Sequence, residues 1–215
     1  MQSGMQSDFI ERIKQRLQRP LPGEDAQYRM APTYRPRMTS DEIAQQQPRL
    51  GGVLVLLYQK ENEWFTVFTQ RRKYEGVHSG QMSFPGGKID DADEDIIQTA
   101  LREAEEEIGV PKAAVEVIGR LTELYIPPSN FLVHPVVAHL HGDKKFTAQE
   151  REVQEIVEIP LSFFLSSNSI KQTEIHLQQG VTTKVPAFVF GEYIIWGATA
   201  IVLSELKEIL EEAGL

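Results

Sequence analysis

Hydrophobic residues recur along this chain with two different spacings, and each spacing predicts one kind of element. Apolar positions three and four residues apart predict a helix over residues 9–17, ending before Pro20. Short runs of β-branched and apolar residues, separated by turns, predict strands over 52–58, 64–69, 115–121, 132–140 and 153–159. Weaker strand patterns cover 174–177, 187–190 and 193–196.

Two longer helices accompany these strands. Residues 95–108 have helical periodicity and are followed by Gly109 and Pro111, which form a stop signal. Residues 199–212 predict a closing amphipathic helix with these apolar residues on one side: Ile201, Leu206, Ile209 and Leu210. The pattern predicts a mixed α/β domain in which a sheet is layered between helices.

The region before the first strand has a different composition. Residues 18–48 contain five of the twelve prolines and little apolar periodicity, which predicts an irregular arm. Within it, Thr39 followed by Glu42 predicts a capping box that opens one short helix. We therefore divide the chain into an N-terminal helix and proline-rich arm, 1–48, packing on a domain that comprises 49–215.

Composition indicates a globular protein. Hydrophobic residues make up 41% and charged residues 25% of the chain. The longest apolar runs, such as 53–57, are too short to span a bilayer, and the polar N-terminus lacks the apolar stretch of a signal peptide. The chain has no cysteine, so disulfides and thiolate metal sites are excluded. A cytoplasmic location is the expectation from these features.

The negative charge is concentrated in one window. The formal charge of −9 argues against non-specific binding to nucleic acid, which needs a basic surface. Between residues 87 and 110 stand nine acidic and two basic residues, so this window carries −7 of the total. Such a concentration either is solvated or gathers cations.

Helical geometry places three carboxylates of this window side by side. At about 100° per residue, Glu103, Glu106 and Glu107 share a face about 100° wide, here called the carboxylate face, while Glu105 points away. Like charges at this spacing destabilise a helix by about 0.2–0.5 kcal/mol per pair, and a divalent cation reverses that effect. On spacing alone, a solvated acidic face is the commoner structure.

The segment before the helix favours the metal. Phe84-Pro85-Gly86-Gly87, the glycine loop, places two glycines where the backbone turns tightly or approaches a ligand. Such a loop can bring main-chain carbonyls to a metal or amides to a phosphate. Glycine loop and carboxylate face together predict a loop–helix metal site.

These residues resemble the signature of the Nudix hydrolase family: a glycine, an acidic residue, then Arg-Glu-apolar-any-Glu-Glu-any-Gly-apolar. The second half stands here as Arg102-Glu103-Ala104-Glu105-Glu106-Glu107-Ile108-Gly109-Val110. The first half begins at Gly87 and has one extra residue. Counting from Gly87 selects Asp93 as the acidic residue, whereas counting back from Arg102 selects Glu94.

The extra residue also occurs in the coenzyme A pyrophosphatase branch of that family. Four further segments resemble this branch: 68–71, 80–87, 152–161 and 195–200. The resemblance covers roughly residues 50–210. Where the branch motif has an arginine, this chain has Gly76, and the basic run Arg71, Arg72 and Lys73 is the candidate for compensating charge.

The resemblance implies a Nudix-like α/β/α sandwich, with a mixed sheet between helices, in residues 49–215. It implies a metal-dependent pyrophosphohydrolase that cleaves coenzyme A or acyl-coenzyme A to 3′,5′-ADP and 4′-phosphopantetheine or its acyl form. One alternative is another nucleoside diphosphate derivative, such as ADP-ribose or a dinucleotide. Another is a Nudix fold that binds a ligand as a regulator without catalysis.

Roles for individual residues follow from the same resemblance. Mg²⁺ or Mn²⁺ would be held by Glu103, Glu106, Glu107 and the main-chain carbonyl of Gly87, and Arg102 would orient one of the carboxylates. The general base would be one of these glutamates or Glu152. The substrate would contact Arg71, Arg72, Gly86 and Gly87.

The implied partner is a small nucleotide substrate, with no nucleic acid and no membrane, and the sequence leaves open whether the chain forms a homodimer. The five histidines show no metal-ligand spacing, and structural or solvated roles are expected for them: His78, His134, His139, His141 and His176.

Overall fold

The computed structural model describes residues 2–72, 80–142, 145–176 and 182–215. Three positions considered above, Lys73, Gly76 and His78, lie outside the described residues. The helices are α1 (Gln2–Leu17), α2 (Gly23–Gln27), α3 (Ser40–Gln45), α4 (Ile96–Ile108), α5 (Leu161–Leu165) and α6 (Gly197–Glu212), with 3₁₀ turns η1 (Tyr28–Met30), η2 (Lys112–Ala114) and η3 (Pro127–Ser129). The strands are β1 (Arg49–Lys60), β2 (Glu63–Arg71), β3 (Met82–Ser83), β4 (Gly86–Lys88), β5 (Val115–Arg120), β6 (Leu124–Ile126), β7 (Phe131–Leu140), β8 (Val153–Pro160), β9 (Ile170–His176), β10 (Thr182–Phe190) and β11 (Tyr193–Ile195).

An eight-stranded mixed sheet forms the centre of the molecule. Its main path runs β3-β2-β1-β7-β5, while β4 pairs with β1, β6 with β7 and β8 with β2. Strands β1 and β7 are parallel, and the other pairs in this sheet are antiparallel. The hairpin β1–β2 turns at Glu61 and Asn62, both at positive φ.

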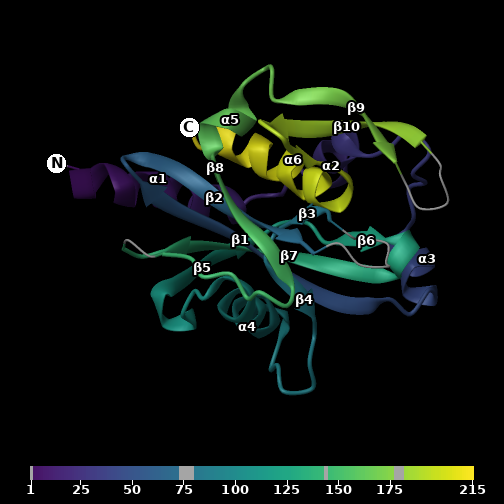
Figure 1. Ribbon diagram of the computed structural model, residues 1–215, viewed down its shortest axis with the longest axis horizontal. Coiled ribbons are helices and arrows are strands. Elements are labelled where there is room, and N and C mark those ends of the chain that lie inside the picture. Colours follow the sequence, from purple (N-terminus) through teal and green to yellow (C-terminus); the bar gives the residue numbers. More distant parts are fainter. Residues whose placement is uncertain (1, 73–79, 143–144, 177–181) are drawn as a thin grey trace.

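Helices cover both faces of this sheet (Figure 1). Helix α4 lies on one face, α6 lies on the other, and a three-stranded antiparallel sheet, β11-β10-β9, lies beyond α6. The predicted mixed α/β class, with a mixed sheet between helices, is therefore confirmed. Strand β1 is buried on both sides: Val55 and Leu57 enter the core on one face, and Leu54 and Leu56 enter the other.

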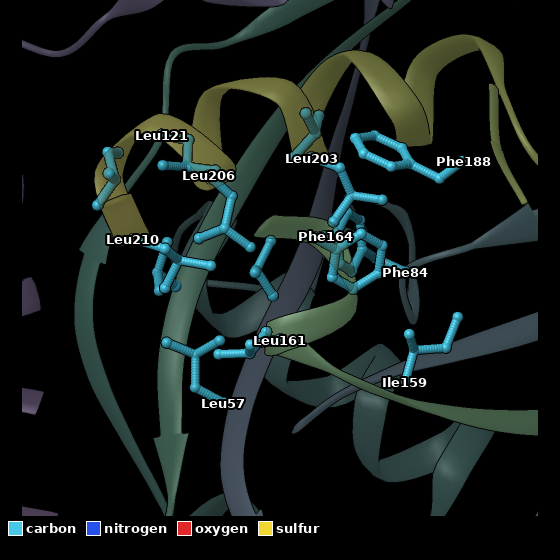
Figure 2. Close-up of a cluster of buried hydrophobic side chains, with 14 of the residues drawn as sticks. Leu57, Phe84, Leu121, Ile159, Leu161, Phe164, Phe188, Leu203, Leu206 and Leu210 are labelled. Carbon is cyan, nitrogen blue, oxygen red and sulfur yellow. The ribbon is translucent and has the colours of Figure 1, made fainter. Parts of the chain in front are cut away.

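The larger core lies under α6 and holds the glycine loop in place. Leu203, Leu206 and Leu210 of α6 pack in one cluster with Phe84 (Figure 2). The ring of Phe84 lies 4.9 Å, centroid to centroid, from that of Phe68 on β2. Residue 84 is thus anchored in the core, and the two glycines that follow it emerge at a defined position.

The arm contains more regular structure than its sequence pattern predicted. The capping box of Thr39 and Glu42 is present at the start of α3. In addition, α2 and η1 form where no apolar periodicity indicated a helix. The buried carboxylate of Glu205 on α6 accepts hydrogen bonds from the Gly23 amide and the Gln27 side chain. Contacts with a residue remote in sequence therefore stabilise these turns.

The observed boundaries of helices and strands differ from the predicted ones mainly where the local sequence pattern is weak. The strand expected at 174–177 is β9, which begins at Ile170, and the strand expected at 187–190 is β10, which begins at Thr182. Strands β3, β4 and β6 were not predicted, because a segment of two or three residues is too short to show a periodic pattern. Among the described residues, no helix is long and apolar enough to cross a membrane.

Candidate functional site

Helix α4 positions the carboxylate face. Its N-cap is Asp95, whose side chain accepts a hydrogen bond from the Gln98 amide at 2.8 Å. It ends at Gly109, which adopts the left-handed conformation at φ 71°. Ala100, Leu101, Ala104 and Ile108 form its apolar stripe and pack it onto the sheet, and the acidic residues lie away from this stripe.

The glycines of the loop permit a close approach of three backbone segments. Gly86 has φ 157°, and a Cβ there would lie 2.4 Å from the main-chain oxygen of Gly52 on β1. A Cβ on Gly52 would lie 2.6 Å from the main-chain oxygen of Ile96, at the start of α4. At Gly87, a Cβ would lie 2.4 Å from the carboxylate carbon of Glu103. The glycine loop therefore lies directly against the carboxylate face.

The three carboxylates of that face have different environments. Glu107 is only 5% exposed although it lies off the apolar stripe, because the glycine loop covers it. Its Oε2 accepts a hydrogen bond of 3.2 Å from the Gly86 amide. Glu103 is partly buried, whereas the side chain of Glu106 is 58% exposed. The site thus has an inner, an intermediate and an outer carboxylate.

Burial raises the pKa of the two less exposed carboxylates, Glu107 and Glu103. The pKa of Glu107 is raised from 4.5 to about 7, mainly by burial; the charges of Glu103 and Glu152 act in the same direction, and Arg71 and the Gly86 amide oppose them. Burial is also the main cause that raises the pKa of Glu103, opposed by Arg102. Carboxylates that are difficult to ionise together are the electrostatic situation that a bound cation relieves.

Arg102 connects this face to the segment before the helix. Its Nε and Nη2 donate to the two oxygens of Asp93, each at 2.9 Å, and its Nη1 donates to Glu103 at 2.8 Å. The more distant contact with Glu106 is 3.4 Å. The guanidinium lowers the pKa of Asp93. Asp93, selected by counting from Gly87, is therefore the acidic partner, and Glu94 is exposed.

Pairing of β2 with β8 brings two more candidates to the site. Arg71, the last residue of β2, pairs with Val153, and the Arg72 amide donates to the main-chain oxygen of Glu152. The charges of both Arg71 and Glu152 act on Glu107, so the two side chains lie in its vicinity. Arg71 is partly buried, and Arg72 is exposed. No local pattern reveals this proximity, because 80 residues separate the two strands' meeting points along the chain.

The residues present fit a hard divalent cation. Among the described residues, the carboxylates of α4 do not bring three ligand atoms within 4.8 Å of one another. Mg²⁺ typically uses one or two carboxylates and keeps several waters, so it does not require such a cluster. Buried Glu107 and partly buried Glu103, which repel each other beside a glycine backbone, supply such a pair of carboxylates.

A comparison with protein families agrees with this geometry. The model of the NUDIX domain matches residues 48–179, which is more than half of the chain. The chain belongs to the Nudix family. Nudix hydrolases generally use divalent metal ions, and Arg102 to Val110 is the second half of this family's signature.

Individual Nudix relatives support the same conclusion. The uncharacterized Nudix hydrolase NudL of Escherichia coli O7:K1 (strain IAI39 / ExPEC) is 38% identical over 144 residues, which cover 65% of this chain and 72% of that protein. The protein of the same name from Shigella boydii serotype 18 matches with the same identity and coverage. This chain is accordingly a hydrolase of the Nudix family.

A solved structure is similar in fold. The Nudix hydrolase RenU from M. Smegmatis matches with a TM-score of 0.51 and 14% identity, covering 78% of this chain and 89% of that chain. At this identity the likeness concerns the fold alone. It agrees with the Nudix α/β/α arrangement of the eight-stranded sheet between α4 and α6.

The segment 195–200 also reaches this region. The hydroxyl of Thr199, in the first turn of α6, donates a hydrogen bond of 2.9 Å to the main-chain oxygen of Met82. Met82 belongs to the segment 80–87, which ends in the glycine loop. Two of the segments that resemble the coenzyme A branch are therefore in contact, although more than 100 residues separate them.

Proposed function

We propose that this Nudix hydrolase cleaves the diphosphate of coenzyme A or acyl-coenzyme A, releasing 3′,5′-ADP and 4′-phosphopantetheine or its acyl form. The observation that supports hydrolysis best is the contact of the carboxylate face with the glycine loop, where Glu107 is buried under Gly86. The set Arg102, Glu103, Glu106 and Glu107 is intact, which argues against a regulator that only binds its ligand.

A phosphoric anhydride resists water because its own negative charge repels the nucleophile. Glu103, Glu106, Glu107 and the main-chain oxygen of Gly87 would hold Mg²⁺ or Mn²⁺, which would supply the compensating positive charge. Arg102 does not contact substrate in this proposal: held by Asp93, it orients the Glu103 carboxylate through the hydrogen bond at 2.8 Å.

The attacking water must lose a proton during the reaction. A glutamate of the carboxylate face or Glu152 accepts it. Glu152 is exposed, and its charge acts on both Glu103 and Glu107, which supports a position beside them.

The preference for coenzyme A rests on charge and on the segments that resemble that branch. Coenzyme A has a 3′-phosphate that plain ADP derivatives lack, and an acidic protein needs a local basic group to bind it. Arg71 and Arg72 stand at the edge of the site, beside Glu152. Gly76, where the branch motif has an arginine, favours the alternative substrates, ADP-ribose or a dinucleotide.

We further propose that residues 1–48 are an extension packed on the Nudix domain of residues 49–215. Two ion pairs support this division: Lys14 of α1 pairs with Glu116 on β5, and Arg16 pairs with Glu212 at the end of α6.

The decisive experiment measures kcat/KM for coenzyme A, dephospho-coenzyme A, ADP-ribose and a dinucleotide, with Mg²⁺ or Mn²⁺ and with chelator, identifying the products by mass. We expect cation-dependent turnover with coenzyme A preferred. Arg71→Gln combined with Arg72→Gln should raise KM more for coenzyme A than for dephospho-coenzyme A. One charge-assisted hydrogen bond contributes about 1.5–3 kcal/mol, equivalent to about tenfold or more.

Lys171→Gln is the matched control, because Lys171 is exposed on β9, in the other sheet. It should leave both KM values unchanged. A wild-type preference for dephospho-coenzyme A or ADP-ribose would support the alternative substrates. Turnover that persists after complete chelation would refute the metal-dependent mechanism.

A further inference from the structure

Two histidines and one glutamate meet at the edge of the central sheet. His139 is the second-last residue of β7 and His141 directly follows this strand; side chains two residues apart project from the same face of an extended chain. Glu116 on β5 is paired directly with His139. One ligand atom from each of the three side chains lies within 4.8 Å of the others. We call these three residues the edge cluster.

The contacts within the edge cluster are close. Nε2 of His141 lies 3.2 Å from Oε2 of Glu116, and the rings of His139 and His141 are 4.5 Å apart, centroid to centroid. The other oxygen of Glu116, Oε1, lies 2.5 Å from Nζ of Lys14 on α1, which also pairs with Glu11. Glu116 therefore directs one oxygen toward a lysine and the other toward the histidines.

The buried Nδ1 of His139 has no hydrogen-bond partner among the described residues. Its ring packs against the indole of Trp64, with centroids 5.7 Å apart. Burial is the main cause that lowers the pKa of His139; the charges of His141 and Lys14 act in the same direction, and Glu116 opposes them.

We propose that Glu116, His139 and His141 bind a transition-metal ion, with Zn²⁺ as the favoured species. Two imidazoles and one carboxylate suit Zn²⁺ better than Mg²⁺, which prefers oxygen ligands alone. Zinc–ligand distances of about 2.0–2.2 Å place neighbouring ligand atoms about 3.4 Å apart in a tetrahedral site. The 3.2 Å between His141 and Glu116 meets this already, and rotation of the His141 side chain, which is 59% exposed, can bring the rest together.

This site is separate from the carboxylate face. In the parallel pairing of β1 with β7, His139 lies opposite Leu57, whereas Gly52, which pairs with Gly87 of the glycine loop, lies opposite His134. Five residues along a strand correspond to about 17 Å. The edge cluster therefore lies toward the other end of β1, where α1 packs beside β5 (Figure 1). A metal there links β5 to β7 and stabilises this edge of the sheet.

Lys14 opposes the metal electrostatically. Its ammonium occupies one oxygen of Glu116, and its charge repels a second cation at the same carboxylate. Removing this charge should therefore tighten metal binding, whereas removing a ligand should weaken it. The opposite signs of these two effects make the proposal testable with exposed or partly exposed residues.

The experiment uses the full chain, with any purification tag removed and metals stripped by chelator and dialysis. Co²⁺ absorption and Zn²⁺ calorimetry are measured for wild type and four variants. We expect wild type to bind one equivalent of Co²⁺ with the visible bands of a four-coordinate nitrogen–oxygen site. His141→Ala and Glu116→Gln should each weaken Zn²⁺ binding at this site about tenfold or more. Lys14→Gln should strengthen it several-fold.

Glu107→Gln is the control for metal bound at the carboxylate face, and it should leave the Co²⁺ bands unchanged. Bands that are lost in Glu107→Gln but kept in His141→Ala would overturn the proposal, because the metal would then be at the other site. Equal Zn²⁺ affinity and stoichiometry in wild type, His141→Ala and Glu116→Gln would overturn it as well. Two separate ligand variants protect the result against misfolding of one.

Discussion

Replacing Glu107 with glutamine removes the charge of the inner carboxylate while keeping its shape. Glu107 is 5% exposed, and its contact with the Gly86 amide needs only an oxygen acceptor, which the glutamine side chain also has. The variant therefore separates the electrostatic role of this residue from its packing role. Activity and stability should respond in opposite directions.

The magnitude follows from the pKa of Glu107, which burial raises from 4.5 to about 7. Each pKa unit corresponds to about 1.4 kcal/mol, so the ionised carboxylate destabilises the metal-free fold by about 3 kcal/mol. The folded protein binds this proton more tightly than the unfolded chain does. The free energy of unfolding should therefore fall as pH rises from about 4.5 to about 7 in wild type, and the part of this fall that Glu107 causes should be absent from the variant.

The assay is urea denaturation of both proteins at pH 5 and pH 8 with chelator present, followed by kcat measurement with saturating Mg²⁺. At pH 8 the metal-free variant should be more stable by up to about 3 kcal/mol, and its kcat should be lower by orders of magnitude. Equal stability of the two proteins at pH 8 would show that the charge of Glu107 does not destabilise the metal-free fold. A kcat within a few-fold of wild type would show that Glu107 is not a metal ligand.

Two further pairs of substitutions test the same site. Glu106→Gln should lower kcat by orders of magnitude without loss of thermal stability, because the side chain is 58% exposed, whereas Glu105→Gln, on the solvated side, should be nearly silent. Gly87→Ala should displace the Glu103 carboxylate, whose carbon would lie 2.4 Å from the new Cβ, and raise the Mg²⁺ concentration for half-maximal activity. Gly86→Ala, at φ 157°, should instead lower the unfolding temperature. If Gly87→Ala had an unchanged Mg²⁺ requirement, the role of Glu103 as a ligand would be contradicted.

The local features of the fold were readable from the sequence. Helix α4, Ile96–Ile108, begins within one residue of the predicted start and ends before Gly109 as predicted, because an N-cap such as Asp95 and a left-handed glycine act on a few neighbouring residues. The mixed α/β class followed from alternating apolar runs and helical periodicity. The short β6 and the turns of α2 did not, since pairing with β7 and contacts with Glu205 stabilise them.

The candidate site divides in the same way. Helical periodicity alone places Glu103, Glu106 and Glu107 on one face, since the spacing of side chains around a helix is a local property. Which of them is buried was decided by the glycine loop, which covers Glu107 and leaves Glu106 in solvent. Likewise, the sequence left open whether Asp93 or Glu94 pairs with Arg102, and the tertiary structure shows that it is Asp93.

Residues that are remote in sequence were placed by strand pairing. Pairing of β2 with β8 places Arg71 opposite Val153, next to Glu152, and pairing of β5 with β7 places Glu116 opposite His139. A sequence carries the chemistry of each such side chain but not its neighbours, because pairing depends on which strands the whole core brings together. Burial, pKa and the charge around each carboxylate depend on those neighbours, so the tertiary structure decided them.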